Sequence, residues 1–378
     1  MINNLNNHRN YLHTIPEIAL KEFKTAAYIR KILDEEKVEY HNVGTSTIAF
    51  IPGESESCIA FRADIDALPL EEESNNPFKS KIPGMMHACG HDGHTSILLT
   101  FIQEIKKLML HGTTLNKSLL FIFQAGEEGA GGARFIIADD FYKSKQIEAI
   151  FALHVYPEIN VGEFAVKTGY VSLQNINLDI TLTGKGCHGA QPHKGTDCIL
   201  VGAKLVEAYQ SIKSRNIPSY EHFLLTIGSF HAGTVRNIIP GSLSMLGTIR
   251  LENTSLIPFI QERIEHINKG FEIAFDVKIE MTFQPFYPPI FNNASLFEKA
   301  LNVLKNKKVF TDISLSGSED FSFYSKNGTP GLFVLIGTRD EEKGHVCALH
   351  NNRFDFDNEA LVHGVEFFKD LLKEYKVI

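Results

Sequence analysis

Several features that define whole classes of protein are missing from this sequence of 378 residues. It contains five cysteines, an odd number scattered along the chain, which argues against a disulfide framework. No stretch approaches the roughly 20 consecutive apolar residues that a membrane-spanning helix needs, so no membrane segment is expected. The first residues lack the basic and then apolar layout of a signal peptide, which predicts a cytoplasmic location.

Positive charge is also scarce. The 37 Lys and Arg residues are outnumbered by 45 Asp and Glu residues, which gives a formal net charge of −8 and argues against nucleic acid as a partner. The sequence has no Gly-x-Ser-x-Gly nucleophile elbow, no phosphate-binding Gly-x-x-x-x-Gly-Lys loop and no dinucleotide-binding glycine fingerprint. With 43% hydrophobic residues the chain can bury a sizeable core, and its length predicts two domains.

Apolar, β-branched runs alternate with helical patterns in the first part of the chain. The runs predict strands at 47–51, 58–62, 118–123 and 147–155. One intervening helix is expected over 93–110, with its N-terminus directly after His91. This alternation predicts an α/β fold with a largely parallel sheet covered by helices.

The pattern changes at about residue 170. Strands are expected at 177–183, 222–230, 242–251 and 277–283, with helices at 197–215 and 255–275. The first pattern then resumes with a helix at 294–306, a strand at 331–337 and a helix at 359–376. We therefore predict a discontinuous domain of residues 1–169 and 284–378, and an inserted α+β domain of residues 170–283.

The densest group of chemically versatile side chains lies between Met86 and His94. It contains three histidines, a thiol and a carboxylate, a combination that suits a transition metal such as zinc or manganese. Any one histidine in such a place could be a helix cap or a surface residue, but the cluster favours a metal site. Cys89 and His91 can point at one site, whereas His87 and His94 could equally be partners of the ligands.

Two adjacent carboxylates, Glu127 and Glu128, follow the predicted strand 118–123. Ligands of open α/β sheets bind at the carboxyl ends of the strands, and adjacent side chains diverge in direction. One Glu can therefore bind a metal while its neighbour acts as the base of a metal-assisted hydrolysis. The alternative is a solvated acidic turn.

Further candidate ligands follow other predicted strand ends. Asp64 and Asp66 follow 58–61, His154 closes 149–153, and His350 follows the segment 344–349. Each of these alone has an ordinary structural explanation, as a turn residue or a satisfied buried histidine. If the strand ends converge, the metal ligands are Cys89, His91, Glu128, His154 and His350, enough for two metal ions, with Glu127 left as the base.

At these residues the sequence resembles the M20 family of metallopeptidases, in particular its amidohydrolase branch of hippurate hydrolases, auxin-conjugate hydrolases and N-acetyldiaminopimelate deacetylases. The resemblance implies a zinc-peptidase-like mixed sheet with helices on both faces, and an inserted α+β lid domain through which a homodimer forms. The segments that carry it are 62–69, 86–92, 127–129, 153–155, 184–193, 237–240, 247–250, 317–321 and 349–350.

The resemblance also implies a role for each candidate residue. The ligands named above would hold two divalent metal ions, of zinc, manganese, cobalt or nickel, with Glu127 as general base. Asp66 would orient a metal ligand, and the separate role of neighbouring Asp64 stays open. His188 resembles the lid histidine that reaches the active site of the partner subunit, and Asn237 and Arg250 resemble residues that bind substrate.

The expected activity is hydrolysis of the amide bond of a small N-acyl amino acid, with N-acetyl the preferred acyl group. Within the family the sequence is most similar to the N-acetyldiaminopimelate deacetylases of lysine biosynthesis. Two alternatives stay open at this point. One is a dipeptidase or aminopeptidase on the same scaffold. The other is a metal-binding protein without catalysis, although neither the base nor a ligand is substituted here.

Overall fold

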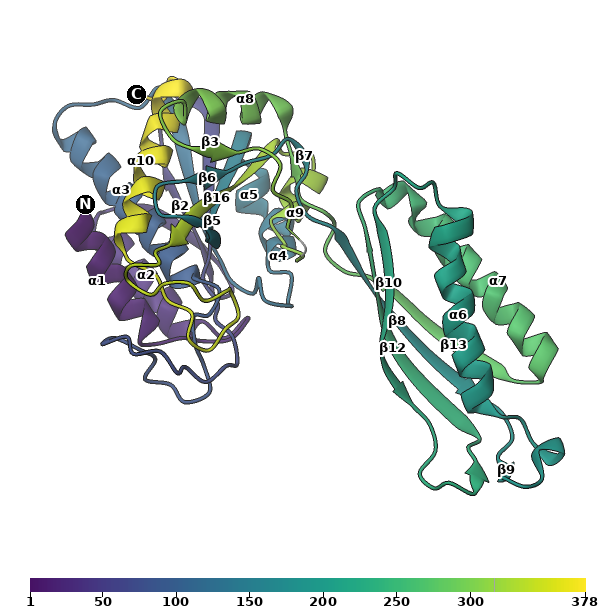
Figure 1. The fold of residues 1–378 in the computed structure, drawn as a ribbon. Helices are drawn as coiled ribbons and strands as arrows, with labels where there is room; N and C mark the ends of the chain where they lie inside the picture. The colour runs from purple at the N-terminus through teal and green to yellow at the C-terminus, as the bar shows by residue number, and fades with distance from the viewer. Residues whose placement is uncertain (316) are drawn as a thin grey trace. The chain divides into compact units, whose positions relative to one another are not determined.

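The computed structural model describes residues 1–315 and 317–378, and two compact units can be distinguished (Figure 1). The first contains Met1–Val171, Ile290–Ser314 and Glu319–Ile378, and the second contains Ser172–Pro289 together with Leu315, Gly317 and Ser318. The last strand of the second unit ends at Pro285, and the unit continues to Pro289, a few residues beyond the expected boundary at 283/284.

The first unit is built on an eight-stranded mixed sheet in the order β1-β2-β4-β3-β5-β16-β6-β15. The four neighbours β4, β3, β5 and β16 run parallel, whereas β1, β2 and β4 pair antiparallel toward one edge. The predicted α/β class is confirmed. The sheet has a parallel centre, and the outer pairings are antiparallel except that of β6 with β15, which is parallel. The strands are β1 (Glu39–Val43), β2 (Ser46–Ile51), β3 (Ser55–Asp64), β4 (Lys117–Gln124), β5 (Gln146–Asn160), β6 (Phe164–Ala165), β15 (Val309–Phe310) and β16 (Gly331–Arg339).

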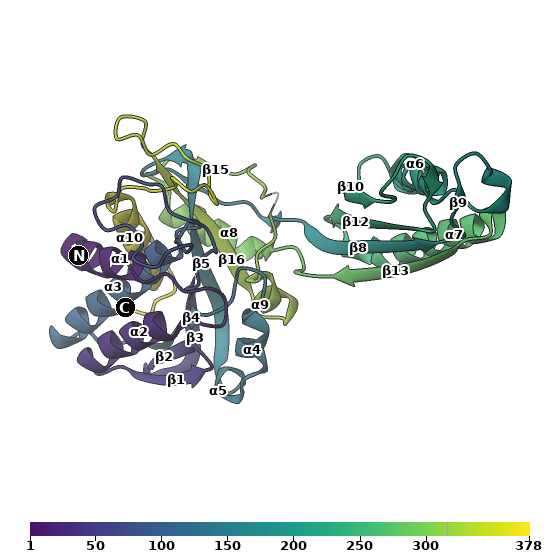
Figure 2. The ribbon, with the colours of Figure 1, turned by 90° about the horizontal axis from the view of Figure 1, so that it is seen from below.

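Helices cover both faces of this sheet, as its central strands require, since strands β3 to β5 are buried on both sides. In Figure 2, α1, α2, α3 and α10 lie on one face, and α4, α5 and α9 lie on the other. The helices are α1 (Ile2–His13), α2 (Phe23–Glu35), α3 (His91–Leu110), α4 (Ala133–Ala138), α5 (Asp140–Lys143), α8 (Ala294–Val303), α9 (Ser322–Lys326) and α10 (Glu359–Glu374).

Helix α3 begins at His91, not at Gly93 as predicted. Its N-cap, Gly90, has a φ of 82°, and a Cβ there would lie 2.4 Å from Cγ2 of Val155, so only glycine fits this entry to the helix. The apolar side of α3, including Phe101, packs in the core between the sheet and α10. No helix within 1–315 and 317–378 is long and apolar enough to cross a membrane.

Two of the expected strand ends differ from the prediction. Strand β5 continues to Asn160 because it stays paired with β16, so His154 lies inside the strand and does not close it. Residues 344–349 form a loop, in which an isolated bridge joins Asp340 to His345. His350 therefore comes from a loop and not from the end of a strand.

The second unit is an antiparallel sheet in the order β10-β12-β8-β13. Helices α6 and α7 pack on one face, and along β8 buried residues alternate with exposed ones, so the other face is open. A separate two-stranded pairing joins β9 (Cys187–His188) to β11 (Ile238–Ile239). The larger elements are β8 (Gln174–Thr183), α6 (Cys198–Asn216), β10 (Phe223–His231), β12 (Ser242–Leu251), α7 (Ile257–Phe275) and β13 (Lys278–Pro285).

Candidate metal centre

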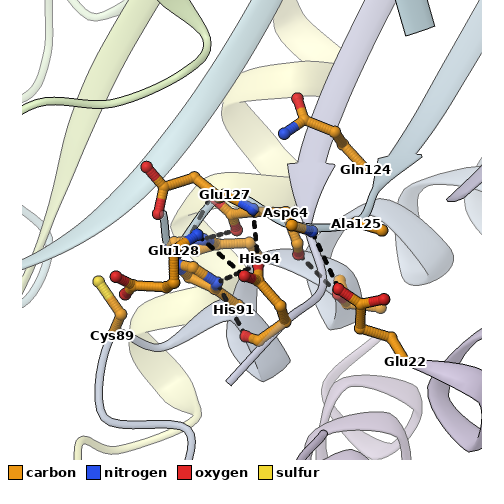
Figure 3. Close-up of polar contacts among 12 residues, drawn as sticks. Glu22, Asp64, Cys89, His91, His94, Gln124, Ala125, Glu127 and Glu128 are labelled. Carbon is orange, nitrogen blue, oxygen red and sulfur yellow. Dashed lines mark hydrogen bonds and ion pairs between the residues drawn. The ribbon is translucent and has the colours of Figure 1, made fainter. Parts of the chain in front are cut away.

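The candidate site lies where the end of β3, the start of α3 and the segment after β4 meet (Figure 3). Asp66, just beyond β3, joins the three. Its carboxylate accepts hydrogen bonds from the backbone amides of Glu127 at 3.1 Å and Glu128 at 2.9 Å. Its carbonyl oxygen accepts a third from Nδ1 of His91 at 2.9 Å. Asp66 therefore sets the position of the paired glutamates relative to His91.

The side chains predicted as metal ligands have their donor atoms close together. Sγ of Cys89 lies 3.5 Å from Nε2 of His154 and 3.3 Å from Nε2 of His350. Oε1 of Glu128 lies 3.2 Å from the same nitrogen of His350. Donor atoms of Cys89, Glu128 and His350 all lie within 4.8 Å of one another, as do those of His91, Glu127 and Glu128. A further group of this kind contains Asp64, His91, His94 and His154. The structure thus brings these residues together from separate parts of the chain.

The two buried histidines are held in the tautomer that suits a metal ligand. Nδ1 of His154 donates to the carbonyl of Val155 at 2.7 Å, and Nδ1 of His91 donates to that of Asp66. With Nδ1 engaged in this way, Nε2 is the atom of each ring that can face a metal. Nε2 of His91 is buried and has no hydrogen-bond partner within the described chain, so a cation at this place would satisfy it. Burial lowers the pKa of His154 well below its ordinary value and keeps that ring neutral.

Asp64 has a different environment from Asp66. It accepts hydrogen bonds from Nη1 of Arg62 at 2.8 Å and from Nδ1 of His94 at 2.6 Å. Burial alone would raise the pKa of Asp64, but His91, His94 and Arg62 lower it well below its ordinary value. Nε2 of His94 accepts the backbone amide of Val155 at 2.9 Å. Both ring nitrogens of His94 are therefore engaged, and His94 holds Asp64 in place with no lone pair left for a metal.

His87, the other histidine whose role the sequence left open, lies outside the candidate ligand groups of the described residues. It is buried, and its ring centroid is 6.3 Å from that of His13. Neither ring nitrogen has a hydrogen-bond partner within the described chain. Burial lowers the pKa of His87 to about 3, so the ring is neutral.

The adjacent glutamates differ in their protonation behaviour. Burial, together with the carboxylates of Glu319 and Glu128, raises the pKa of Glu127 well above its ordinary value. Burial would do the same to Glu128, but His350 and His91 lower the pKa of Glu128 below its ordinary value. Two neighbouring carboxyls whose pKa values are pushed apart suit two tasks, proton transfer for the first and cation binding for the second.

A buried network behind Asp64 was missed by sequence reasoning. Arg62 is 2% exposed, and it donates to Gln124 at 3.0 Å and to Asp320 at 2.8 Å. Oε1 of Glu319 lies 3.0 Å from Nη2 of Arg62. An arginine in an otherwise apolar strand signals that a buried acidic partner must exist. The position of Asp320, 258 residues further along the chain, carries no local signal of that pairing.

His350 is held in an uncommon backbone conformation. Its φ is 62°, and its backbone amide donates to the carbonyl of Ala88 at 2.8 Å. Non-glycine residues rarely adopt positive φ, and such positions gather at functional sites. This conformation brings the half-exposed imidazole of His350 to Cys89 and Glu128.

The remaining predicted residues, His188, Asn237 and Arg250, belong to the second unit. His188 pairs with Ile238, next to Asn237. Nδ1 of His188 accepts the backbone amide of Ala190 at 3.1 Å, so in the neutral ring the proton is on the exposed Nε2. Arg250 lies in β12 and is half-buried, and its Nη1 has no hydrogen-bond partner within the described chain.

The site combines groups that can share a cation, namely a thiol, several imidazoles and a carboxylate, with a second carboxyl suited to proton transfer. This combination defines the site of a metal-dependent hydrolase. Residues 60–374 match the model of peptidase family M20/M25/M40. The chain belongs to this family of hydrolases.

Known proteins similar to the chain agree with this assignment. An uncharacterized hydrolase of Staphylococcus aureus (strain bovine RF122 / ET3-1) is 34% identical over 98% of each chain. A crystal structure of a dinuclear metal-binding peptidase of the M20 family from Bacillus subtilis is 29% identical, with a TM-score of 0.85 over 100% of this chain and 99% of that one. A protein of methicillin-resistant S. aureus is 27% identical, with a TM-score of 0.90 over 100% of this chain and 97% of that one.

If Cys89 is a ligand, bound metal should protect it from alkylation. We expect slow labelling of Cys89 by iodoacetamide when zinc is present and faster labelling after chelation, because a metal–thiolate bond occupies the sulfur. Mass spectrometry of the cysteine-containing peptides measures both rates. Cys187, partly exposed in the second unit, is the internal control and should react equally in both conditions. Labelling of Cys89 that is indifferent to metal would contradict its role as a ligand.

Proposed function

We propose that this hydrolase cleaves the amide bond of N-acyl amino acids, N-acetyl amino acids in particular, and releases a carboxylic acid and a free amino acid. The observation that carries the proposal is the division between Glu127 and Glu128, whose amides are both held by Asp66. Both side chains lie near His91, but Glu127 also groups with Glu319 and Asp320, and Glu128 with Cys89 and His350. Such a pair supplies a base and a metal ligand side by side. Amide hydrolysis needs both.

The metal ligands in this proposal are Cys89, His91, Glu128, His154 and His350. Their donor atoms fit two divalent ions such as zinc, manganese, cobalt or nickel, and the similar M20 peptidase from B. subtilis is dinuclear. When bound, such ions activate water and polarise the substrate carbonyl. Two aspartates lie beside the proposed metal ligands. Asp66 orients His91, and Asp64 is held in place by His94.

Glu127 is the general base and later the general acid. Its raised pKa allows it to take a proton from the attacking water and to return it to the departing nitrogen. The Glu127 carboxyl therefore serves both steps, since it keeps the proton between the attack of water and the departure of the nitrogen. Burial of Glu127 keeps bulk water from exchanging that proton.

The substrate carboxylate is assigned to Arg250, with Asn237 as a further substrate contact. Arg250 has Leu224 and Asn175 as its cross-strand neighbours, neither of which is acidic. Burial lowers the pKa of Arg250 from its ordinary value, yet a guanidinium remains charged. A half-buried guanidinium with a free N–H is suited to a carboxylate, which it can bind through two parallel hydrogen bonds.

The proposal includes a homodimer formed through the second unit, in which His188 completes the partner's site and donates from Nε2 to the developing oxyanion. Strand β10 is an edge strand, and Leu224 and Leu246 are 55% and 54% exposed. Exposed edges and apolar side chains of this kind mark interfaces.

A direct comparison of substrates tests the proposed reaction. Metal-reconstituted protein should hydrolyse N-acetyl amino acids, including N-acetyldiaminopimelate, faster than dipeptides that carry a free amine. Both classes of substrate carry the carboxylate that is assigned to Arg250. A difference in their hydrolysis rates therefore reports the preference for an acyl group over a free amine. Release of free amino acid is measured for each compound at equal concentration. Faster cleavage of the dipeptides would favour a dipeptidase or aminopeptidase on the same scaffold.

Substitution of each glutamate separates the two proposed tasks. Glu127→Gln should keep its metal and lose about 10²–10⁴-fold in kcat, the range for a positioned acid–base group. Glu128→Gln should lose metal first. Metal content by elemental analysis and kcat on an N-acetyl amino acid are measured for both variants. Equal loss of metal in the two variants would contradict the assignment of the pair.

Mixing two inactive variants tests the role of His188. His188→Ala and Glu127→Ala chains are each expected to be nearly inactive. After subunit exchange about a quarter of wild-type activity should return, because about half of the dimers are heterodimers and one of their two sites is intact. Exchange is verified with differently tagged chains. If activity stays at the level of the two parents, His188 does not act across a dimer.

A further inference from the structure

Arg9, near the middle of α1, is buried and makes several polar contacts, although it is far in sequence from the proposed metal ligands. Its side chain is 1% exposed. Nε donates to Asp92 at 3.1 Å, and Nη2 donates to Asp355 at 2.6 Å. Nη1 donates to the carbonyl of Phe356 and to Oδ1 of Asn358, each at 2.6 Å. The guanidinium also stacks on the ring of Phe356, 3.6 Å from its centroid.

These contacts reach two of the segments that supply metal ligands to the proposed site, those of His91 and His350. Asp92 directly follows His91 in the first turn of α3, and its carboxylate also accepts a hydrogen bond from His13 at 2.8 Å. Residues 355–358 lie a few positions after His350 in the loop that leads to α10. Arg9 therefore holds the segment of His91 and the segment of His350 from one side chain.

Packing also holds the same two segments against each other. The ring of Phe356 lies against the start of α3, so close that a Cβ on Gly93 would be 2.8 Å from it and a Cβ on Gly90 would be 3.4 Å from it. At the other end of the loop, the backbone amide of His350 donates to the carbonyl of Ala88. A displacement of Phe356 would thus move the loop of His350 relative to Cys89 and His91.

We propose that Arg9 is a positioning residue for the metal centre, which sets the distance between the ligands of the 89–91 segment and His350 through Asp92, Asp355 and Phe356. This inference rests on the proposed metal site and extends it to a residue of α1. The hydrogen bonds of Arg9 go to sequence neighbours of the ligands, so Arg9 acts on the ligands through these neighbours. The inference predicts that Arg9 determines how tightly the metal is held.

The shape of the guanidinium explains why arginine is needed. Its planar fork serves acceptors in several directions and stacks on Phe356 at the same time. A lysine ammonium keeps the positive charge beside Asp92 and Asp355 but cannot make all of these contacts. Arg9→Lys therefore removes the positioning while it keeps a positive charge beside Asp92 and Asp355.

The test compares the metal affinity of Arg9→Lys with that of the wild type. Affinity for zinc is measured in competition with a chromophoric chelator, and the absorption spectrum of the cobalt-loaded protein reports the arrangement of thiolate and imidazole around the metal. We expect an affinity about 10–100-fold lower in Arg9→Lys, the usual effect of losing a partner behind a metal ligand, and an altered cobalt spectrum.

Ile105→Ala is the matched control. Ile105 is buried in α3, and at 1.5 Å per residue it lies about 21 Å along the helix from His91, so its truncation destabilises the same core without reaching the ligands. Its metal affinity and cobalt spectrum should equal those of the wild type. Equal losses of affinity in both variants would overturn the proposal, because general destabilisation would then explain the effect.

Two further outcomes are decisive. If Arg9→Lys does not fold, Asn358→Ala removes one acceptor of Arg9, and we expect a smaller loss of affinity in the same direction. If Arg9→Lys binds zinc as tightly as the wild type, the proposed role of Arg9 is overturned and the proposed function is unaffected. The same holds for Asn358→Ala where that variant is used in place of Arg9→Lys. A wild-type protein that binds no divalent metal would instead contradict the proposed function.

Discussion

The structure of the site depends on one electrostatic constraint, the burial of many carboxyl groups in one place. Asp64, Asp66, Glu127, Glu319 and Asp320 are all at most 6% exposed. Arg62 contacts Asp64, Glu319 and Asp320, and its single positive charge cannot balance them all. Nε2 of His91 lies 3.7 Å from Oδ2 of Asp64 and has no hydrogen-bond partner in the described chain. Divalent cations are the groups that this arrangement fits.

The fold explains how such a cluster can be assembled. The parallel centre of the sheet places Asp64 and Asp66 at the end of β3 beside Glu127 and Glu128 beyond the end of β4. Asp66 then ties both glutamates to the start of α3 through backbone amides. Asp64 and Asp66, whose roles the sequence could not separate, differ in their partners. Asp64 faces charged side chains, and Asp66 mainly orders the backbone.

Much of this could be predicted from sequence because its signals are local. The strands of the core, helix α3 and the second unit follow from periodicity, and Cys89, His91, Glu127 and Glu128 stand in short dense segments. The sequence predicts His350 at a strand end, whereas it lies in a loop with a positive φ and a hydrogen bond to Ala88. Its environment depends on contacts between distant segments.

The same limit applies to Arg62 and Arg9. Each is a buried arginine whose need for acidic partners can be inferred from its surroundings in sequence, but one partner of each, Asp320 and Asp355, lies 258 and 346 residues away. In both cases the chain places a guanidinium behind the candidate metal ligands and not among them. Several candidate metal ligands carry a local signal in the sequence, whereas the long-range contacts that position them do not.

The most direct test of the account is anomalous diffraction from crystals grown with zinc. Two peaks per chain should lie between Cys89, His91, Glu128, His154 and His350, one of them about 2.3 Å from Sγ of Cys89, the length of a zinc–thiolate bond. Peaks elsewhere in the molecule, or none among these side chains, would contradict the assignment of this cluster as a metal centre.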